Sequence, residues 1–527
     1  MNKLWNSAVC GAALAATALL AFNPSVEAQQ ASATSSAASE TAGAVRELQD
    51  QVRQLRATME EMRAENAQSR AEMEQLRADL KTTRALLEQP GTTTLSNVTA
   101  ESGPAPASAA SPAAGPSQPE GRIQKLEETT SLLASKIDEQ YQTKVETASK
   151  YRARLHGIIL MNAFRNLGGS DNFDLPDFAQ PVPPGSPQAT IGATLRQSEI
   201  GLEIFGPNLA GAKTSANVQF DFTGGFAGTG NSVNFGLVRL QTANLNLDWD
   251  HTRVVVGQDS LFFSPLSPTS FASLATPAFA FGGNLWGWTP QIRVEHRFSV
   301  SDQQTISVQA GVLDNLDWEY QSDPFFRMPQ AGERSGQPAY AVRTSWSRPV
   351  REHPLTFGVA GYFGRQDWTW DRYVDAWAGM ADWQVPISSR LSLSGEFYRG
   401  RGIGGLGGAV GRAIVYGGDP FRGSTPIRGL NAAGGWTQLK LQITPKVELN
   451  GVIAEDDTFA GDVRGFASDA NNFGPILGRN RGALGNVVFR PRSDLVFSAE
   501  LRRLRSFPIY SNSSFTNQVN LSMGILF

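Results

Sequence analysis

Arginine is the residue type with the greatest chemical potential in this chain of 527 residues. Beyond Lys150 the sequence holds 29 arginines and only 3 lysines, against 31 aspartates and glutamates, which gives this part a net charge of +1. A guanidinium binds carboxylate or phosphate in a planar, bidentate manner, and rings of basic residues form anion-conducting pores. The basic candidates for such a role are Arg152, Arg154, Arg293, Arg297, Arg343 and Lys440. Acidic residues occupy equivalent positions, namely Glu199, Glu203, Glu295, Glu396, Glu448 and Glu500, so the mixture of signs predicts only a weak preference for anions.

Other kinds of chemistry find little support. The single cysteine, Cys10, lies in a segment expected to be removed, and the four histidines are scattered, so we expect no metal site and no cofactor. Residues 402–407 match a dinucleotide-binding glycine pattern, but more glycine and a turn-rich stretch follow them, which favours an extracellular loop. Asp456-Asp457 is predicted to lie in a loop, facing water or a loosely held calcium ion. No catalytic constellation appears, so we expect a protein that is not an enzyme. A net charge of −3 argues against nucleic-acid binding.

The elements that must position the charged side chains are predicted to be strands. From Tyr151 onward apolar and polar residues alternate, as in Ile292, Val294, His296 and Phe298 against their neighbours. About sixteen strands are expected, beginning near residues 152, 195, 213, 236, 252, 289, 304, 338, 354, 374, 391, 435, 446, 483, 494 and 516. Short connections alternate with long ones at 259–287, 400–433 and 456–481, the asymmetry of an outer-membrane barrel.

The fold class predicted for residues 151–527 is therefore an all-β transmembrane barrel of about 16 antiparallel strands. Its polar faces would line a lumen and its apolar faces would contact outer-membrane lipid. The aromatic residues Trp249, Trp286, Trp288, Trp383 and Tyr398 would form the interfacial girdles. A soluble sandwich or solenoid is the alternative, but no internal linker and no fixed repeat support it.

The amino terminus resembles a secretory signal peptide. Lys3 precedes an uncharged apolar run, Ala8 to Phe22, and Val26-Glu27-Ala28 forms a small-x-small cleavage site. Residues 1–28 are therefore expected to be removed, so that the mature chain begins at Gln29.

A coiled coil is predicted for residues 40–89, because apolar residues recur there with a seven-residue period. The proposed oligomerisation seam comprises Val45, Leu48, Val52, Leu55, Met59, Met62, Asn66, Met73, Leu76 and Leu80. Residues 90–120 are rich in Ala, Ser and Pro and are expected to be a linker, and a short second coiled coil is expected at 121–148. The α-helical coil ahead of the barrel would hold identical subunits together, although the seam itself leaves a dimer or a trimer open.

With these features the chain resembles the coiled-coil-bearing trimeric porins of Gram-negative outer membranes, the DcaP-like porins, and more distantly the phosphate-selective porins. The resemblance rests on Tyr151 to Gly157, Arg196 to Leu202 and the final strand Gln518 to Phe527. It implies a homotrimer in the cell outer membrane, with its coil in the periplasm, that lets small hydrophilic solutes diffuse passively. An envelope-tethering protein is the alternative, in which the coil reaches the cell wall and the barrel serves as an anchor.

The resemblance also assigns a role to the apolar segment 259–287. Porins of this kind fold one long loop into the barrel to narrow it, and the candidate residues here are Phe262, Phe263, Phe271, Phe279 and Phe281. A lid or a subunit-contact loop is the alternative for this segment.

Overall fold

The computed structural model describes residues 152–226, 236–315, 317, 319, 326–350 and 353–527, together with the backbone of 144–145. Two compact units divide the chain, Met1–Gly115 and Pro116–Phe527, and every described residue belongs to the second unit. The predicted signal peptide, the seam and the linker lie outside the described residues. Among the residues that are described, no helix is long and apolar enough to cross a membrane.

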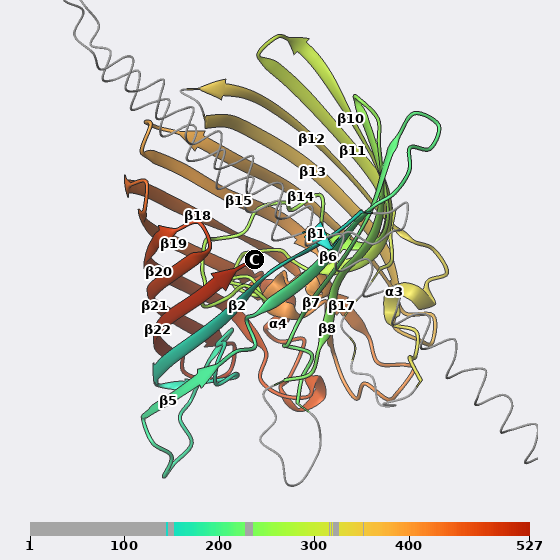
Figure 1. The fold of residues 1–527 in the computed structure, drawn as a ribbon. Helices are drawn as coiled ribbons and strands as arrows, with labels where there is room; N and C mark the ends of the chain where they lie inside the picture. The colour runs from blue at the N-terminus through green and yellow to red at the C-terminus, as the bar shows by residue number, and fades with distance from the viewer. Residues whose placement is uncertain are drawn as a thin grey trace, which may run out of the picture. The chain divides into compact units, whose positions relative to one another are not determined.

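A closed antiparallel β-barrel forms the second unit (Figure 1). Its wall consists of β2 (Arg152–Leu167), β5 (Ala189–Thr194), β6 (Glu199–Phe205), β7 (Lys213–Asp221), β8 (Arg239–Asp248), β9 (Thr252–Ser260), β10 (Trp288–Ser301), β11 (Gln304–Leu313), β12 (Ala339–Val350), β13 (His353–Asp367), β14 (Tyr373–Pro386), β15 (Leu391–Arg401), β18 (Asn431–Thr444), β19 (Val447–Thr458), β20 (Leu477–Arg492), β21 (Leu495–Pro508) and β22 (Ser514–Leu526).

The wall contains 16 strands in the described part of the chain, because β5 and β6 both pair with β2 and form one interrupted strand. Closure comes from β2, which also pairs with the last strand, β22. The predicted fold class and the strand number are confirmed for the barrel.

The two ends of the barrel differ in their connections. At one end, here called the turn rim, strands are joined by short segments such as 249–251, 302–303, 445–446 and 493–494. At the other, the loop rim, the connections include 168–188, 222–238, 261–287, 314–338, 402–430 and 459–476. The short elements of the loop rim are β3 (Gly169–Ser170), β4 (Ala179–Gln180), α3 (Ala331–Arg334), η1 (Gly404–Leu406), η2 (Ala409–Gly411), β16 (Ile414–Tyr416), β17 (Ile427–Gly429), α4 (Ala460–Val463) and η3 (Ala470–Asn472).

The predicted alternation of faces is also confirmed. On β10, Ile292 and Val294 are half exposed on the outer face, whereas Gln291 is buried on the inner face. The predicted girdle position is wrong for Trp286 and Tyr398, however, because both side chains are buried inside the barrel. Tyr398 has the inward phase of its strand, and Trp286 belongs to a loop that folds inward.

The strand β1 (Lys144–Val145) pairs with Ala153 and Arg154 of β2. These two residues belong to the segment expected to form the second coiled coil. At this point the structure is therefore a strand and not a helix.

Candidate functional site

The long connection between β9 and β10, residues 261–287, folds across the interior of the barrel. Its backbone N–H groups at Leu266 and Thr269 donate to Glu396 Oε1 at 2.8 Å and to Gln438 Oε1 at 2.7 Å. Farther along, the Ser270 hydroxyl donates to Glu500 Oε2 at 2.6 Å. Since these acceptors lie on the inner faces of β15, β18 and β21, the loop is fastened to one half of the inner wall.

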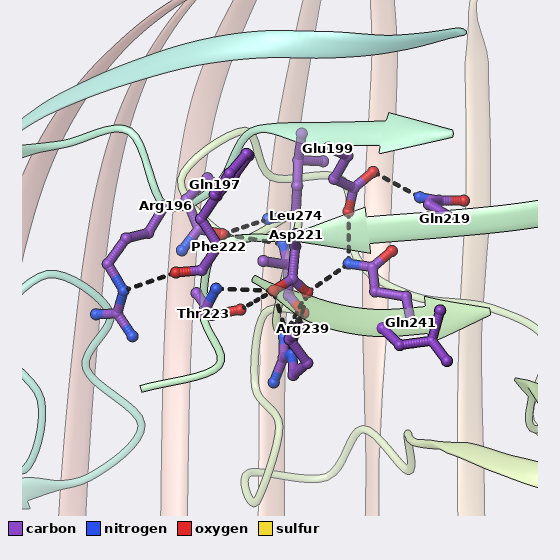
Figure 2. Close-up of polar contacts among 12 residues, drawn as sticks. Arg196, Gln197, Glu199, Gln219, Asp221, Phe222, Thr223, Arg239, Gln241 and Leu274 are labelled. Carbon is purple, nitrogen blue, oxygen red and sulfur yellow. Dashed lines mark hydrogen bonds and ion pairs between the residues drawn. The ribbon is translucent and has the colours of Figure 1, made fainter. Parts of the chain in front are cut away.

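The tip of the loop is tied to the opposite side by Gln197 and Arg239. The Gln197 Oε1 atom accepts hydrogen bonds from both Leu274 N and Ala275 N at 3.0 Å, and Figure 2 shows Gln197 beside Leu274. The Arg239 Nη2 atom donates to Ala275 O at 2.7 Å. The loop therefore spans the barrel and is attached to the inner wall on both sides.

Asp221 organises the wall beneath this attachment (Figure 2). Its carboxylate is fully buried and pairs with Arg239 at 2.7 Å, and it accepts hydrogen bonds from Thr223 N and Gln241 Nε2. Glu199 on the neighbouring strand accepts from Gln241 Nε2 at 3.0 Å. Because buried charges require such partners, the cluster fixes Arg239 in the position from which it reaches the loop.

Sequence reasoning did not find Gln197, Asp221 or Arg239. A signal was present, because Arg196-Gln197-Ser198 places three polar residues in succession where a strand should alternate. All three side chains are buried at the interruption between β5 and β6, and Ser198 Oγ accepts a hydrogen bond from Leu160 N at 2.9 Å.

The five phenylalanines of the predicted constriction loop pack against the barrel interior. Phe263 lies 5.4 Å from the ring of Tyr362, and Phe262 belongs to the same buried cluster. The remaining three pack as follows: Phe279 with Trp436 and Leu484, Phe271 with Ile158 and Val488, and Phe281 stacked on Phe178. These side chains therefore anchor the loop, whereas the open part of the lumen is bordered by other residues.

A second connection, residues 402–430, also enters the loop-rim end of the barrel. Val410 N donates to Asp456 Oδ2 at 2.8 Å, the Tyr398 hydroxyl donates to Asp456 Oδ1 at 2.6 Å, and Trp286 N donates to Leu406 O at 3.0 Å. Residues 402–407 form a loop, as predicted, and they fold inward so that most of them are buried against the first loop. The prediction for Asp456-Asp457 is wrong: both residues belong to β19, Asp456 points inward and is buried, and Asp457 pairs with Arg479 on the outer face.

The loops cover the inner wall unequally. Inward-facing residues of β18, β20, β21 and β22 are largely buried, whereas those of β6, β7 and β10 are mostly half exposed. The uncovered half carries Glu199, Asn217, Gln219, Glu295 and Arg297. A solute that crosses the barrel would meet this polar half of the wall.

The charged residues predicted to line the lumen all have the inward phase of their strands. Arg293 pairs with Asp259 at 2.7 Å, and Arg343 is buried against Asp382 at 2.7 Å. Glu295 accepts from Gln309 Nε2 at 2.9 Å. Neutralised in this way, Arg293 and Arg343 contribute less free charge to the lumen than the sequence implied.

The other candidates lie near the turn rim. Arg154 pairs with Glu203 at 2.5 Å, and Lys440 lies 3.4 Å from Glu448 beside a cavity of about 290 Å³. Arg152 and Arg297 are exposed, and neither forms an ion pair with another described residue. Further inward-facing basic residues at this rim are Lys213, Arg253 and Arg490.

One acidic residue in a loop has an altered titration. Burial raises the pKa of Asp317 to about 7, and its carboxylate accepts hydrogen bonds from Gly332 N and Gln366 Nε2. Asp317 thereby ties the connection 314–338 to β13. Among the described residues, no group of three His, Cys, Asp or Glu side chains is placed to hold a metal ion.

A closed barrel of this strand number with a loop across its interior has the architecture of an outer-membrane porin. The fold is similar to that of the outer membrane channel DcaP of Acinetobacter baumannii, with a TM-score of 0.55 and 15% sequence identity over 72% of this chain and 99% of that chain. Two further solved structures match less closely: OprB of Pseudomonas putida has a TM-score of 0.45 and 14% identity over 71% and 94% of the two chains, and an anion-selective porin from Comamonas acidovorans has a TM-score of 0.43 and 11% identity over 72% and 100%. No protein-family model and no curated protein matches the sequence.

Proposed function

We propose that this chain is an outer-membrane channel through which small hydrophilic solutes diffuse passively. The observation that carries the proposal is the unequal filling of the barrel: loop 261–287 packs on one half of the inner wall and leaves much of the polar inner face of β6, β7 and β10 accessible. A structural anchor would have no need of a polar, uncovered half. The fold shared with DcaP supports the same conclusion.

The direction of the channel follows from its two rims. In outer-membrane barrels the short turns face the periplasm and the long loops face outward. The turn rim would therefore be periplasmic, on the same side as the predicted coiled coil. Trimer formation through the coil belongs to this proposal, as does its contact with the cell wall.

A modest preference for anions is the finer part of the proposal. The inner face near the turn rim carries Arg152, Lys213, Arg253, Arg297 and Arg490, of which Arg253 pairs with Asp248 at 2.6 Å and Arg490 lies 3.9 Å from Glu448. A basic ring lowers the barrier for anions. The preference stays modest because Glu199 and Glu295 on the uncovered half accept hydrogen bonds only from neutral side chains among the described residues, which leave their charge in place. Small organic acids and phosphate-like solutes fit this arrangement.

The test is the reversal potential of the full-length protein in a salt gradient, compared with Arg297→Gln and Arg293→Gln. Arg297 has no acid partner among the described residues. Its replacement therefore removes one unpaired positive charge from the lumen and should shift the reversal potential toward cation selectivity. Arg293→Gln also leaves the Asp259 carboxylate without its cation and should shift the reversal potential at least as far. Arg481→Gln, on the outer face, is the matched control and should have no effect.

A cation-selective wild type would contradict the anion preference. An equal shift in Arg481→Gln would show that the effect does not come from the lumen.

A further inference from the structure

On the described strands, most charged residues of the outer face lie near the loop rim, whereas Arg348 lies near the turn rim. On β19, β20 and β21, outward positions near the loop rim are Glu455, Asp457, Arg479, Arg481, Arg503 and Arg505. Their intervening neighbours, Asp456, Asn480 and Arg502, are buried on the inner face, which fixes the phase.

The same level is charged on neighbouring strands. Arg399 and Arg401 follow on β15, Arg365 pairs with Asp375 at 2.8 Å across β13 and β14, and Arg165 lies outward on β2. Together with the six residues above, these five residues are here called the outer belt. Register places three of these residues in one row, because Glu455 lies opposite Arg481 and Arg481 opposite Arg505.

Apolar side chains occupy the outer face directly beyond the belt, toward the turn rim. Phe397, Ile453, Val487 and Leu501 are all exposed there. The belt therefore marks the upper edge of the apolar band. A charged side chain costs about 2–4 kcal/mol at the middle of a bilayer and about 0–1 kcal/mol at its interface, so this edge is where arginines are tolerated.

The belt covers only part of the circumference. Within the described residues, the outward positions of β6 to β11 carry no Arg, Lys, Asp or Glu and are mainly aliphatic, as in Ile200, Val218, Leu245, Val256 and Val312. Interfacial height alone does not explain such an asymmetry, since every strand crosses the same edge. The belt side must therefore meet a partner that the other side does not.

A groove of about 920 Å³ lies on the outer wall where the belt meets the apolar band. Its charged side is bordered by Arg481, Arg503 and Arg505 together with the acids Glu455 and Asp457, and its apolar side by Trp383, Phe397 and Ile453. Small residues such as Gly435 and Ala483 leave the wall between them hollow. The groove is thus amphipathic along the direction in which a lipid would lie.

The charge of the belt indicates the headgroup. It contains eight arginines against three acids, and Arg503 and Arg505 form no ion pair with another described residue. Arg505 only donates to Ser513 Oγ at 3.0 Å, and Arg503 lies over the ring of Phe515. Two such belts facing each other would repel, which argues against a second copy of the chain as the partner. Guanidinium groups bind phosphate with bidentate geometry.

We propose that the groove and the outer belt bind a phosphorylated lipid of the outer leaflet, with its phosphates on Arg503 and Arg505 and its acyl chains on Phe397 and Ile453. This inference rests on the proposed outer-membrane placement, but it does not depend on conduction. The lipid would lie against β15 to β21, leaving the aliphatic outer faces of β6 to β11 for other contacts.

The experiment is native mass spectrometry of the full-length protein in detergent, titrated with bis-phosphorylated lipid A and with the same lipid after removal of both phosphates. The phosphorylated lipid should bind at least tenfold more tightly. R503Q/R505Q should abolish that difference, and R348Q/R390Q should retain it, because this control removes the same charge from the turn rim.

Equal binding of the two lipids, or an equal loss in the control variant, would overturn the proposal. Dissociation of subunits in R503Q/R505Q without loss of lipid would overturn it in favour of an interface between copies. Heat-modifiable electrophoretic mobility verifies that each variant is folded. Conductance of R503Q/R505Q should match the wild type, so failure of lipid binding and failure of the channel proposal are distinguishable.

Discussion

Removal of the Gln197 acceptor should release the tip of the loop that crosses the barrel. The substitution Gln197→Met keeps the side-chain volume but leaves Leu274 N and Ala275 N without their acceptor. Gln197 is only 1% exposed, so water does not readily replace it. An unsatisfied buried donor costs about 1–3 kcal/mol, which gives about 2–6 kcal/mol for the pair.

That loss changes the equilibrium between attached and detached tip by about 30-fold or more, since each 1.4 kcal/mol is roughly a factor of ten. The loop should nevertheless stay in the barrel, because Ser270 still donates to Glu500 and Arg239 still donates to Ala275 O. We therefore expect a functional channel with a larger mean conductance and stronger current noise.

Single-channel recording measures both quantities. Gln197→Glu retains an acceptor and should resemble the wild type more closely. Gln219→Met is the matched control, because Gln219 lies on the same wall and bonds Glu199 but does not bond the loop. Wild-type noise in Gln197→Met, or increased noise in Gln219→Met, would refute the role of Gln197 as a tether.

Three further predictions concern the loops and the amino-terminal region. Burial raises the pKa of Asp317 to about 7, so the folded state holds a proton on this carboxyl that the unfolded state releases above about pH 4. The stability of the connection 314–338 should therefore fall as the pH rises from 4 to 7. Limited proteolysis at pH 5 and pH 8 should show this difference in the wild type and not in Asp317→Asn. Gly283→Ala should destabilise the barrel by more than about 1 kcal/mol in urea unfolding, because a Cβ would lie 2.4 Å from Gly435 O. Gly379→Ala, at which a Cβ meets no atom within 4 Å, is the control, and equal effects of the two substitutions would contradict the close approach. The isolated segment 40–90 should self-associate in sedimentation, and a monomer at high concentration would contradict its role as the seam.

Sequence alone could predict the strands, because their signal is local. Period-two alternation identifies the phase of β10 from Ile292 and Val294 without knowledge of any neighbour. The same reasoning assigned the inward phase of Arg293, Glu295 and Lys440 correctly.

The remaining features depend on contacts between residues far apart in the chain. Asp456 looks like a loop acid in sequence, and only the approach of Tyr398 and Val410 makes it a buried acceptor. Gln197 has no periodic signature, because its partners are backbone N–H groups 77 and 78 residues away. The ion pairs that neutralise Arg293 and Arg343 likewise require strand register, which periodicity does not provide.

Conductance of the full-length protein in a planar lipid bilayer tests the central claim most directly. The channel proposal predicts discrete, ohmic current steps from folded, heat-modifiable protein, and a changed step size in Gln197→Met. Folded protein that inserts into the bilayer and passes no current would contradict the proposal and would favour a barrel that serves as a membrane anchor.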